Sequence, residues 1–417
     1  MARSKIPDLL FDDILLERAA RISRLCCRYD IRETEFALDR ITLFVTHRCN
    51  LFCRYCNGPH MNKAIDPALR REMLKADITL GLYKKLLKDW SEYRVKYIHF
   101  TGGEATLNKN LPEFIRLARE SSILCSLTTN GTAGIKLYRK LIDSGLTEIR
   151  ISIDSMDEAE YDRLVRKKGA HKKVIQNIKD IIAMRDREKK DIFIVLNICV
   201  GTFNVSNIKS NLKYFFDLDP DDIKLLVIGE QSKKIYPRAS RKIVDELLCY
   251  SHDLKPGYKL LDNKIHTLFR RHARGLKDPA SRYEMQHCFI PLTERTLDAR
   301  GYYPCSIYLR YYGDRILDIN STFQEQKNEI IDFIDNHDCL HDPICKNFCT
   351  NCCKKYSLIV NREISNYILR REACTSRIVK VESITPNEIS KVISNFNKIS
   401  RKKGMDFHPF IRILGSC

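Results

Sequence analysis

The sequence predicts an α/β fold: a partial (β/α)6 TIM-like barrel with a small Cys-rich C-terminal domain. Two observations carry this prediction. Six short apolar runs between residues 41 and 228 are separated by helical patterns, which is typical of a parallel sheet covered by helices. From Cys288 the composition changes abruptly, and eight cysteines follow up to Cys374.

The chain divides into five predicted segments. Apolar residues at helical spacing, such as Leu9, Leu10 and Ile14, predict that the N-terminal segment is helical. The segments are residues 1–39 (helical), 40–228 (the partial barrel), 229–287 (a polar helical connector), 288–374 (an auxiliary domain) and 375–417 (a helix with a basic tail).

The expected strands of the barrel are Ile41–Val45, Tyr97–Phe100, Leu124–Thr128, Glu148–Ile153, Phe193–Val200 and Ile223–Ile228. Helices are expected between them, for example at 134–143 and 172–187. The stretch Asn110-Leu-Pro-Glu113 predicts a helix start with an N-cap residue and a capping-box glutamate.

Composition limits the class of protein. The formal net charge is +19, which favours acidic partners, although a solvated basic surface is the preferred explanation. We find neither a signal peptide nor an apolar run near the ~20 residues of a membrane span, so a cytoplasmic protein is expected. Seventeen cysteines in such a protein indicate metal or redox sites rather than disulfides.

Three cysteines follow the first expected strand with the spacing C-x3-C-x2-C: Cys49, Cys53 and Cys56. This spacing holds three thiolates close enough to bind one iron–sulfur cluster. A cubane has four irons, so one iron stays open to a small molecule, unlike an electron-carrying cluster held by four cysteines. The alternative is zinc, with His47 or His60 as the fourth ligand.

Polar residues also end the next three expected strands, in Thr101-Gly-Gly-Glu104, Thr128-Thr-Asn-Gly131 and Ser152-Ile-Asp154. Functional groups in parallel α/β folds gather where the strands end. We therefore expect these three clusters and the cysteine loop to share one rim of the barrel.

The cysteine loop and these clusters resemble the radical S-adenosylmethionine (SAM) superfamily over residues 40–230. The resemblance implies a [4Fe-4S] cluster on Cys49, Cys53 and Cys56, with catalysis through a 5′-deoxyadenosyl radical made from SAM. It also implies SAM-binding roles for Tyr55, Gly102, Gly103, Glu104, Thr129, Asn130, Ser152 and Asp154. Ala105 stands where many members have proline, which is a minor departure.

The C-terminal cysteines resemble the SPASM and twitch extensions of radical SAM enzymes, which hold auxiliary [4Fe-4S] clusters. The resemblance implies one such cluster on Cys288, Cys305, Cys349 and Cys352. Asn336 stands where the SPASM pattern has its first cysteine. Whether a second cluster uses the remaining Cys339, Cys345, Cys353 and Cys374 stays open, and a zinc knuckle is the alternative for the region.

The resemblance implies hydrogen abstraction from a substrate, with an electron passed through the auxiliary cluster. The first hypothesis is oxidation or epimerisation of a small molecule such as a sugar or aminocyclitol. The alternatives are a ribosomal-peptide or protein maturase, and an RNA-modifying enzyme that the basic charge would serve. A non-enzymatic zinc protein is the last. Expected partners are the substrate and a reductant such as flavodoxin or ferredoxin, with no membrane; nucleic acid is disfavoured because the basic residues are spread.

Overall fold

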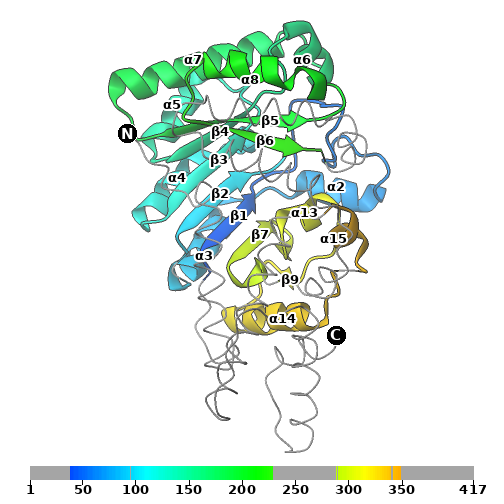
Figure 1. Cartoon of the computed structure of the whole chain (residues 1–417). Helices are drawn as coiled ribbons and strands as arrows, with labels where there is room; N and C mark the ends of the chain where they lie inside the picture. Colours follow the sequence, from blue (N-terminus) through cyan, green and yellow to red (C-terminus); the bar gives the residue numbers. More distant parts are fainter. Residues whose placement is uncertain (1–37, 94, 229–287, 289, 340, 349–417) are drawn as a thin grey trace, which may run out of the picture. The chain divides into compact units, whose positions relative to one another are not determined.

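The computed structural model describes residues 38–93, 95–228, 288, 290–339 and 341–348 of the 417-residue chain (Figure 1). The predicted helix at 385–399, most of the predicted N-terminal segment and the connector lie outside these ranges. The described residues belong to two compact units. The first holds residues 38–228 and 295–319; the second holds the described residues within 288–294 and 320–348.

Six parallel strands form the centre of the first unit and confirm the predicted partial barrel. They are β1 (Arg40–Phe44), β2 (Tyr97–Thr101), β3 (Leu124–Thr129), β4 (Glu148–Ser152), β5 (Phe193–Val200) and β6 (Asp222–Val227). Each pairs in parallel with the next along the chain. Within the described residues the sheet stays open, with β6 at one edge.

A second strand group continues the sheet beyond β1. Strand β7 (Glu294–Asp298) lies beside β1, followed by β8 (Gly301–Tyr303) and β9 (Leu317–Asp318) in antiparallel pairing. The hairpin of β7 and β8 is therefore an extension of the barrel sheet. The segment boundaries given above stay predictions.

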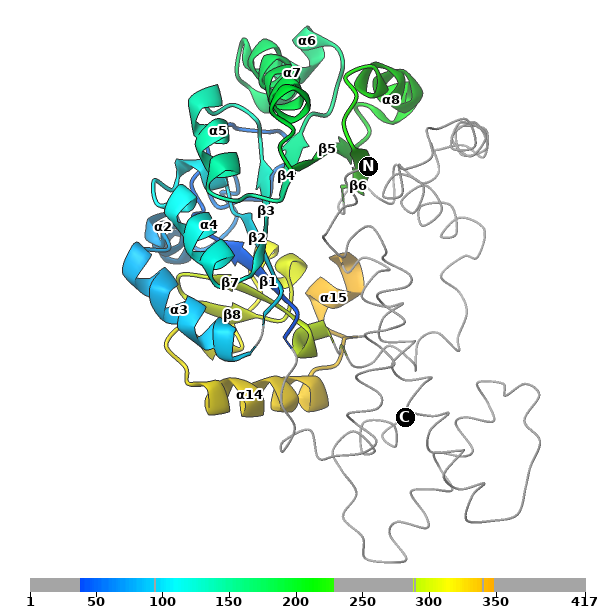
Figure 2. The same ribbon diagram turned by 90° about the vertical axis from the view of Figure 1, so that its left-hand side faces the viewer.

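The helices of the first unit follow the strands in alternation. They are α2 (Pro67–Lys75), α3 (Leu80–Glu92), α4 (Leu111–Glu120), α5 (Ile135–Asp143), α6 (Glu158–Val165), α7 (Ala170–Glu188), α8 (Ile208–Phe216) and α13 (Ser306–Arg310), with short 3-10 turns η2 (Ala105–Leu107) and η3 (Val205–Asn207). Figure 2 shows α3, α4, α5 and α7 along one face of the sheet.

The second unit contains η5 (Ile290–Leu292), α14 (Phe323–Asn336) and α15 (Pro343–Phe348). Helix α14 begins with a complete capping box, in which Thr322 and Glu325 each bond the other's backbone. Among the helices within the described ranges, none combines the length and apolar character that crossing a bilayer requires.

The start of α4 departs in detail from its prediction. Asn110 does occupy the N-cap position, but its side chain makes no capping hydrogen bond. The Glu113 carboxylate instead pairs with the guanidinium of Arg116 at 2.6 Å. The predicted capping box is therefore wrong, because a charged partner one turn further along competes for Glu113.

The two faces of the parallel sheet differ in chemistry. The face toward the helices is apolar and fully buried. Ile98 pairs with Ile41 and Cys125, and Ile149 pairs with Leu127 and Ile194. The opposite face, here named the polar inner face, carries the polar residues Thr42, His99, Ser126, Thr128, Glu148, Arg150, Ser152 and Asn197, with the apolar Phe193 and Val195 on β5 beside them. One face thus supplies the core, and the other presents hydrogen-bonding groups below the strand ends.

Candidate active site

The cysteine loop follows β1, and backbone hydrogen bonds connect it to the last residues of helix α6. The backbone N–H groups of Phe52 and Arg54 donate to the carbonyls of Val165 and Leu164 at 3.1 and 3.0 Å. This brings Cys49, Cys53 and Cys56 together closely enough that the three thiols influence one another electrostatically.

Burial raises the pKa of Cys49 to about 11 and also raises the pKa of Cys53. Two backbone N–H groups donate to these sulfurs. The N–H of Leu51 lies 3.5 Å from Cys49 Sγ, and that of Gly58 lies 3.2 Å from Cys56 Sγ. Three clustered thiols with N–H donors fit a thiolate-bound metal cluster, because binding a cation deprotonates such thiols and the donors stabilise the sulfur charge.

Two glycines allow the end of β2 to lie directly on the backbone that leads into Cys49. Gly103 and Glu104 donate their N–H groups to the carbonyls of Thr46 and Arg48, both at 2.8 Å. A Cβ on Gly102 would lie 2.1 Å from the Thr46 carbonyl oxygen, and one on Gly103 would lie 2.3 Å from that of Arg48. Gly102 also has φ +149°, which disfavours other residues. These contacts fix the direction in which the loop leaves the sheet.

The Glu104 carboxylate ties the second strand end to the third. It accepts hydrogen bonds from the Thr129 hydroxyl and the Asn130 N–H, both at 2.7 Å, as well as from the hydroxyl and N–H of Thr106. Burial raises the pKa of Glu104, while these donors act in the opposite direction. Thr129 is buried on the helix side of the sheet, where it also contacts the Tyr138 hydroxyl at 3.1 Å.

Asn130 links the third strand end to the cysteine loop. Its Nδ2 donates to Asn50 Oδ1 at 2.8 Å and lies 3.8 Å from Cys49 Sγ. Its Oδ1 accepts from the Thr132 hydroxyl at 2.7 Å, and Thr132 in turn accepts from Asn50 Nδ2 at 2.9 Å. The predicted residues Cys49, Glu104 and Asn130 are therefore brought together in one continuous network.

The fourth strand end approaches the loop through Asp154. This buried carboxylate accepts from the Tyr55 hydroxyl at 2.5 Å and from the Cys199 N–H at 2.7 Å. Burial raises the pKa of Asp154 to about 6, against the opposing effect of these donors. Tyr55 also stacks on Phe203 with ring centroids 5.7 Å apart. Ser152 lies half-buried on the polar inner face, paired in register with Asn197.

Sequence reasoning missed the contact between the loop and the C-terminal hairpin. His47 Nε2 lies 2.9 Å from Asp298 Oδ2 at the end of β7. Although burial opposes ionisation, the bond with His47 and the charge of Arg300 lower the pKa of Asp298. The two residues are 251 positions apart, so no local pattern could have revealed them.

The hairpin segment touches the loop again at Asn57. Asn57 Nδ2 donates to the Arg310 carbonyl at 3.0 Å, and the Tyr312 hydroxyl donates to the Asn57 carbonyl. The Arg310 guanidinium lies over the Phe44 ring, 5.4 Å from its centre. Residues 295–319 thus form one wall of the candidate site.

A second missed residue is Asn204, which is fully buried in the loop after β5. Its Nδ2 donates to the carbonyls of Asp154 and Cys199 at 2.8 and 2.9 Å, and its Oδ1 accepts from Gly201 N–H at 2.9 Å. It joins the ends of β4 and β5. The sequence signal for Asn204 was a polar residue four positions after a buried strand. This signal is too common in ordinary turns to identify a site residue.

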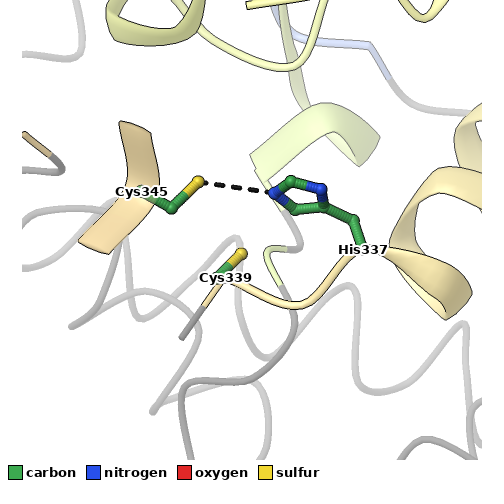
Figure 3. Close-up of side chains that lie close together, drawn as sticks. All are labelled: His337, Cys339 and Cys345. Carbon is green, nitrogen blue, oxygen red and sulfur yellow. Dashed lines mark hydrogen bonds between the residues drawn. The ribbon is translucent and has the colours of Figure 1, made fainter. Parts of the chain in front are cut away.

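In the second unit, three potential metal ligands lie together: His337, Cys339 and Cys345 (Figure 3). The Cys339 thiol hydrogen bonds the sulfurs of Cys288 and Cys345, and these bonds, with burial, raise its pKa. Of the predicted auxiliary ligands, Cys305 belongs to the first unit, and Cys349 and Cys352 lie outside the described residues. That ligand set stays a prediction.

Comparison with known proteins agrees with this geometry. Residues 43–205 match the radical SAM superfamily. The chain therefore contains a radical SAM domain, and the cofactors that come with such a domain are a [4Fe-4S] cluster and SAM.

Curated relatives resemble part of the chain. A PqqA peptide cyclase from Bradyrhizobium diazoefficiens is 27% identical over 186 residues, which is 44% of this chain and 45% of that protein. One from Xanthomonas oryzae pv. oryzae is 36% identical over 125 residues, 30% of this chain and 31% of that protein. The chain thus spans less than half the length of these relatives.

Solved structures share the fold over more of the chain. Streptococcus suis SuiB, bound to its precursor peptide SuiA, aligns with a TM-score of 0.51 at 13% identity, covering 78% of this chain and 71% of SuiB. Native anSMEcpe with bound AdoMet aligns with a TM-score of 0.50 at 15% identity, covering 81% of this chain and 98% of that protein. At these identities the likeness concerns the fold alone.

Proposed function

We propose that this protein is a radical SAM enzyme that modifies a peptide or protein substrate. The observation that carries the chemistry is the three-cysteine loop, clamped by Gly102, Gly103, Glu104 and Asn130 at adjacent strand ends. In this proposal Cys49, Cys53 and Cys56 hold the [4Fe-4S] cluster. When bound, the cluster and SAM supply a 5′-deoxyadenosyl radical that takes a hydrogen atom from the substrate.

The polar inner face would receive SAM and the reacting part of the substrate. Ser152 and Thr128 are half-buried there, and Asn197 is 4% exposed. Asn197 Oδ1 has no hydrogen-bond partner among the described residues, which is unusual for a buried amide. A ligand that donates a hydrogen bond beside Ser152 would satisfy it.

The remaining predicted residues would act mainly by holding the cysteine loop and the strand ends in place. Tyr55 and Asp154 hold the loop to the fourth strand end, while Thr129 and Glu104 hold the third. Side chains fixed by such bonds would hold the bound cluster and SAM in one geometry and would exclude water from the site.

The relatives' names support a peptide substrate over a small molecule. The curated relatives are peptide cyclases, and the aligned SuiB structure contains a precursor peptide. The net charge of +19 would suit an acidic peptide. Oxidation of a sugar or aminocyclitol thus becomes the second candidate. An auxiliary [4Fe-4S] cluster on C-terminal cysteines and a flavodoxin- or ferredoxin-type reductant complete the proposal.

The chemistry is tested by anaerobic reconstitution of the full chain, followed by dithionite reduction with SAM. We expect 5′-deoxyadenosine as a product, and about four irons fewer per chain in Cys49→Ala, Cys53→Ala and Cys56→Ala, with product formation lost. Cys125→Ala is the control, because Cys125 is buried in the core beneath α4. Formation of 5′-deoxyadenosine by the three loop variants at the wild-type rate would refute the radical assignment.

The substrate class needs its own experiment. The reconstituted protein is incubated with SAM and the product of any short peptide gene beside its own gene, and the peptide is analysed by mass spectrometry. A loss of about two hydrogens or another defined mass change supports the peptide proposal. An unchanged peptide, together with turnover of a sugar or aminocyclitol, would replace it with the small-molecule candidate.

A further inference from the structure

We propose that His337, Cys339, Cys345 and Cys288 form a mononuclear zinc site in the second unit. The radical SAM chemistry above uses none of His337, Cys339 and Cys345, whereas Cys288 was expected to bind the auxiliary cluster. All four residues lie in one compact unit, so the inference rests on no placement of one unit against the other.

Two helix ends bring the donors together. His337 follows the last residue of α14, and its N–H donates to the Phe333 carbonyl at 2.9 Å. Its ring stacks on that of Phe333, with centroids 4.4 Å apart and planes 19° apart. Cys345 lies near the start of α15, where its N–H donates to Asp342 at 2.7 Å. Cys339 lies in the connection between the two helices, so both flanking ligands are fixed by local structure.

Spacing indicates that one metal ion, rather than a cubane, joins the donors. The Nδ1 or Nε2 and Sγ atoms of His337, Cys339 and Cys345 all lie within 4.8 Å of one another. His337 Nε2 lies 3.4 Å from Cys345 Sγ, as Figure 3 shows. Zn–N and Zn–S bonds of about 2.0 and 2.3 Å at a tetrahedral angle place N and S ~3.6 Å apart. Ligands on separate irons of a cubane point outward from different corners and lie further apart.

The donor chemistry agrees. His337, Cys339 and Cys345 supply three donors. We assign Cys288 as the fourth because it belongs to the same unit and interacts with Cys339. Three thiols and an imidazole are a set typical of structural zinc, while magnesium and calcium take oxygen ligands. The nearby His341 is exposed, bonds Asp338 at 2.6 Å and does not belong to the group of clustered donors.

The assignment moves Cys288 from the predicted auxiliary cluster to zinc. Cys305, Cys349, Cys352, Cys353 and Cys374 remain for an iron–sulfur centre. The zinc would connect α14 to α15 and to the residues that precede β7.

The test is elemental analysis of the full chain purified from medium supplemented with both iron and zinc. We expect about one zinc per chain. We expect this zinc to fall at least fivefold in His337→Ala, Cys339→Ser and Cys345→Ser, and to be retained in His337→Cys and in the control His341→Ala. A triple alanine variant of Cys49, Cys53 and Cys56 should keep the zinc while losing iron, which separates this proposal from the radical SAM assignment.

Cobalt provides a second measurement that does not depend on zinc uptake during expression. Co²⁺ added to the metal-free full chain should give the absorption of a tetrahedral thiolate complex, weakened in Cys288→Ser and Cys339→Ser. Loss of iron and sulfide instead of zinc from the His337 and Cys345 variants would overturn the proposal. Zinc content unchanged by all four substitutions would overturn it as well.

Discussion

The imidazole of His47 hydrogen bonds the carboxylate of Asp298 at 2.9 Å, and both side chains are almost completely buried. His47 lies two residues before the first cysteine of the loop, and Asp298 ends the strand added beside β1. Arg300 also bonds this carboxylate, at 2.7 Å. The hairpin therefore holds the base of the cysteine loop through one buried, charge-assisted contact.

We expect His47→Ala to destabilise the first unit by about 1–3 kcal/mol, because a buried carboxylate loses one of its two partners. Thermal unfolding and iron content after reconstitution measure the effect. Asp298→Asn should be milder, since the amide oxygen still accepts from His47 and Arg300. As a control, Arg116→Ala removes only exposed ion pairs on α4 and should leave both readouts near wild type. Equal behaviour of His47→Ala and the control would show that the contact does not support the loop.

Gly103→Ala should lower the free energy of unfolding by about 1–3 kcal/mol, because the new methyl group meets the carbonyls of Arg48 and His47. The clash can be relieved only by moving the loop, so iron binding should fall as well. Gly81→Ala is the matched control, since nothing lies within 4 Å of a Cβ there. Iron content is measured beside thermal unfolding for both variants, and wild-type iron binding in Gly103→Ala would contradict the prediction.

The raised pKa of Asp154 predicts that the free energy of unfolding depends on pH. Its pKa is about 6 in the folded protein against 3.8 for an ordinary aspartate, so the folded state favours the protonated form. The stabilisation is therefore fully present below about pH 4 and is lost as the pH rises through 6. Two pKa units correspond to roughly 3 kcal/mol.

We expect Asp154→Asn to remove this loss, since the amide does not ionise. The comparison uses a background in which Cys49, Cys53 and Cys56 are alanine, so that no cluster contributes. Melting temperatures of the two proteins should diverge between pH 4 and pH 7, with the asparagine variant relatively more stable at the higher pH. Parallel curves across this range would refute the buried-carboxylate explanation.

Asn204→Ala should destabilise the first unit by about 3 kcal/mol or more, because it leaves two carbonyls and one N–H group without their partner. Asn204→Asp should also destabilise, since it keeps the acceptor but loses both donors. Gln176→Ala removes a single exposed bond to Asp180 and serves as the comparison. Chemical denaturation distinguishes the three variants, and an Asn204→Ala protein as stable as Gln176→Ala would contradict the assignment.

The strands could be predicted because each signal is local. The run Phe193–Val200 is observed with its predicted bounds, and β2 and β3 each extend one residue further than expected. The cysteine loop was equally accessible, since its three cysteines lie within eight residues of chain. Because alternating strands and helices form a parallel sheet, the polar strand ends were expected at one rim. The hydrogen bonds of Glu104 and Asn130 show that these ends lie together.

The rest depended on contacts between distant segments. Nothing near Asp298 in the sequence indicates His47, and nothing near Cys339 indicates that Cys288 interacts with it. The prediction gave Gly102 and Gly103 a role in SAM binding, whereas the structure supplies a second reason for both: they touch the backbone of residues 46–48. Such a reason appears only when two loops are seen together.

The separation of 251 positions between His47 and Asp298 also matters during synthesis. At typical translation rates the ribosome needs roughly 10–50 s to reach the hairpin after the cysteine loop has emerged. Until then the nascent barrel lacks one wall, and its thiols are open to oxidation or stray metals. We therefore expect a correctly shaped site only after residues 295–319 have been synthesised, and a fragment ending at β6 would lack the partner of His47.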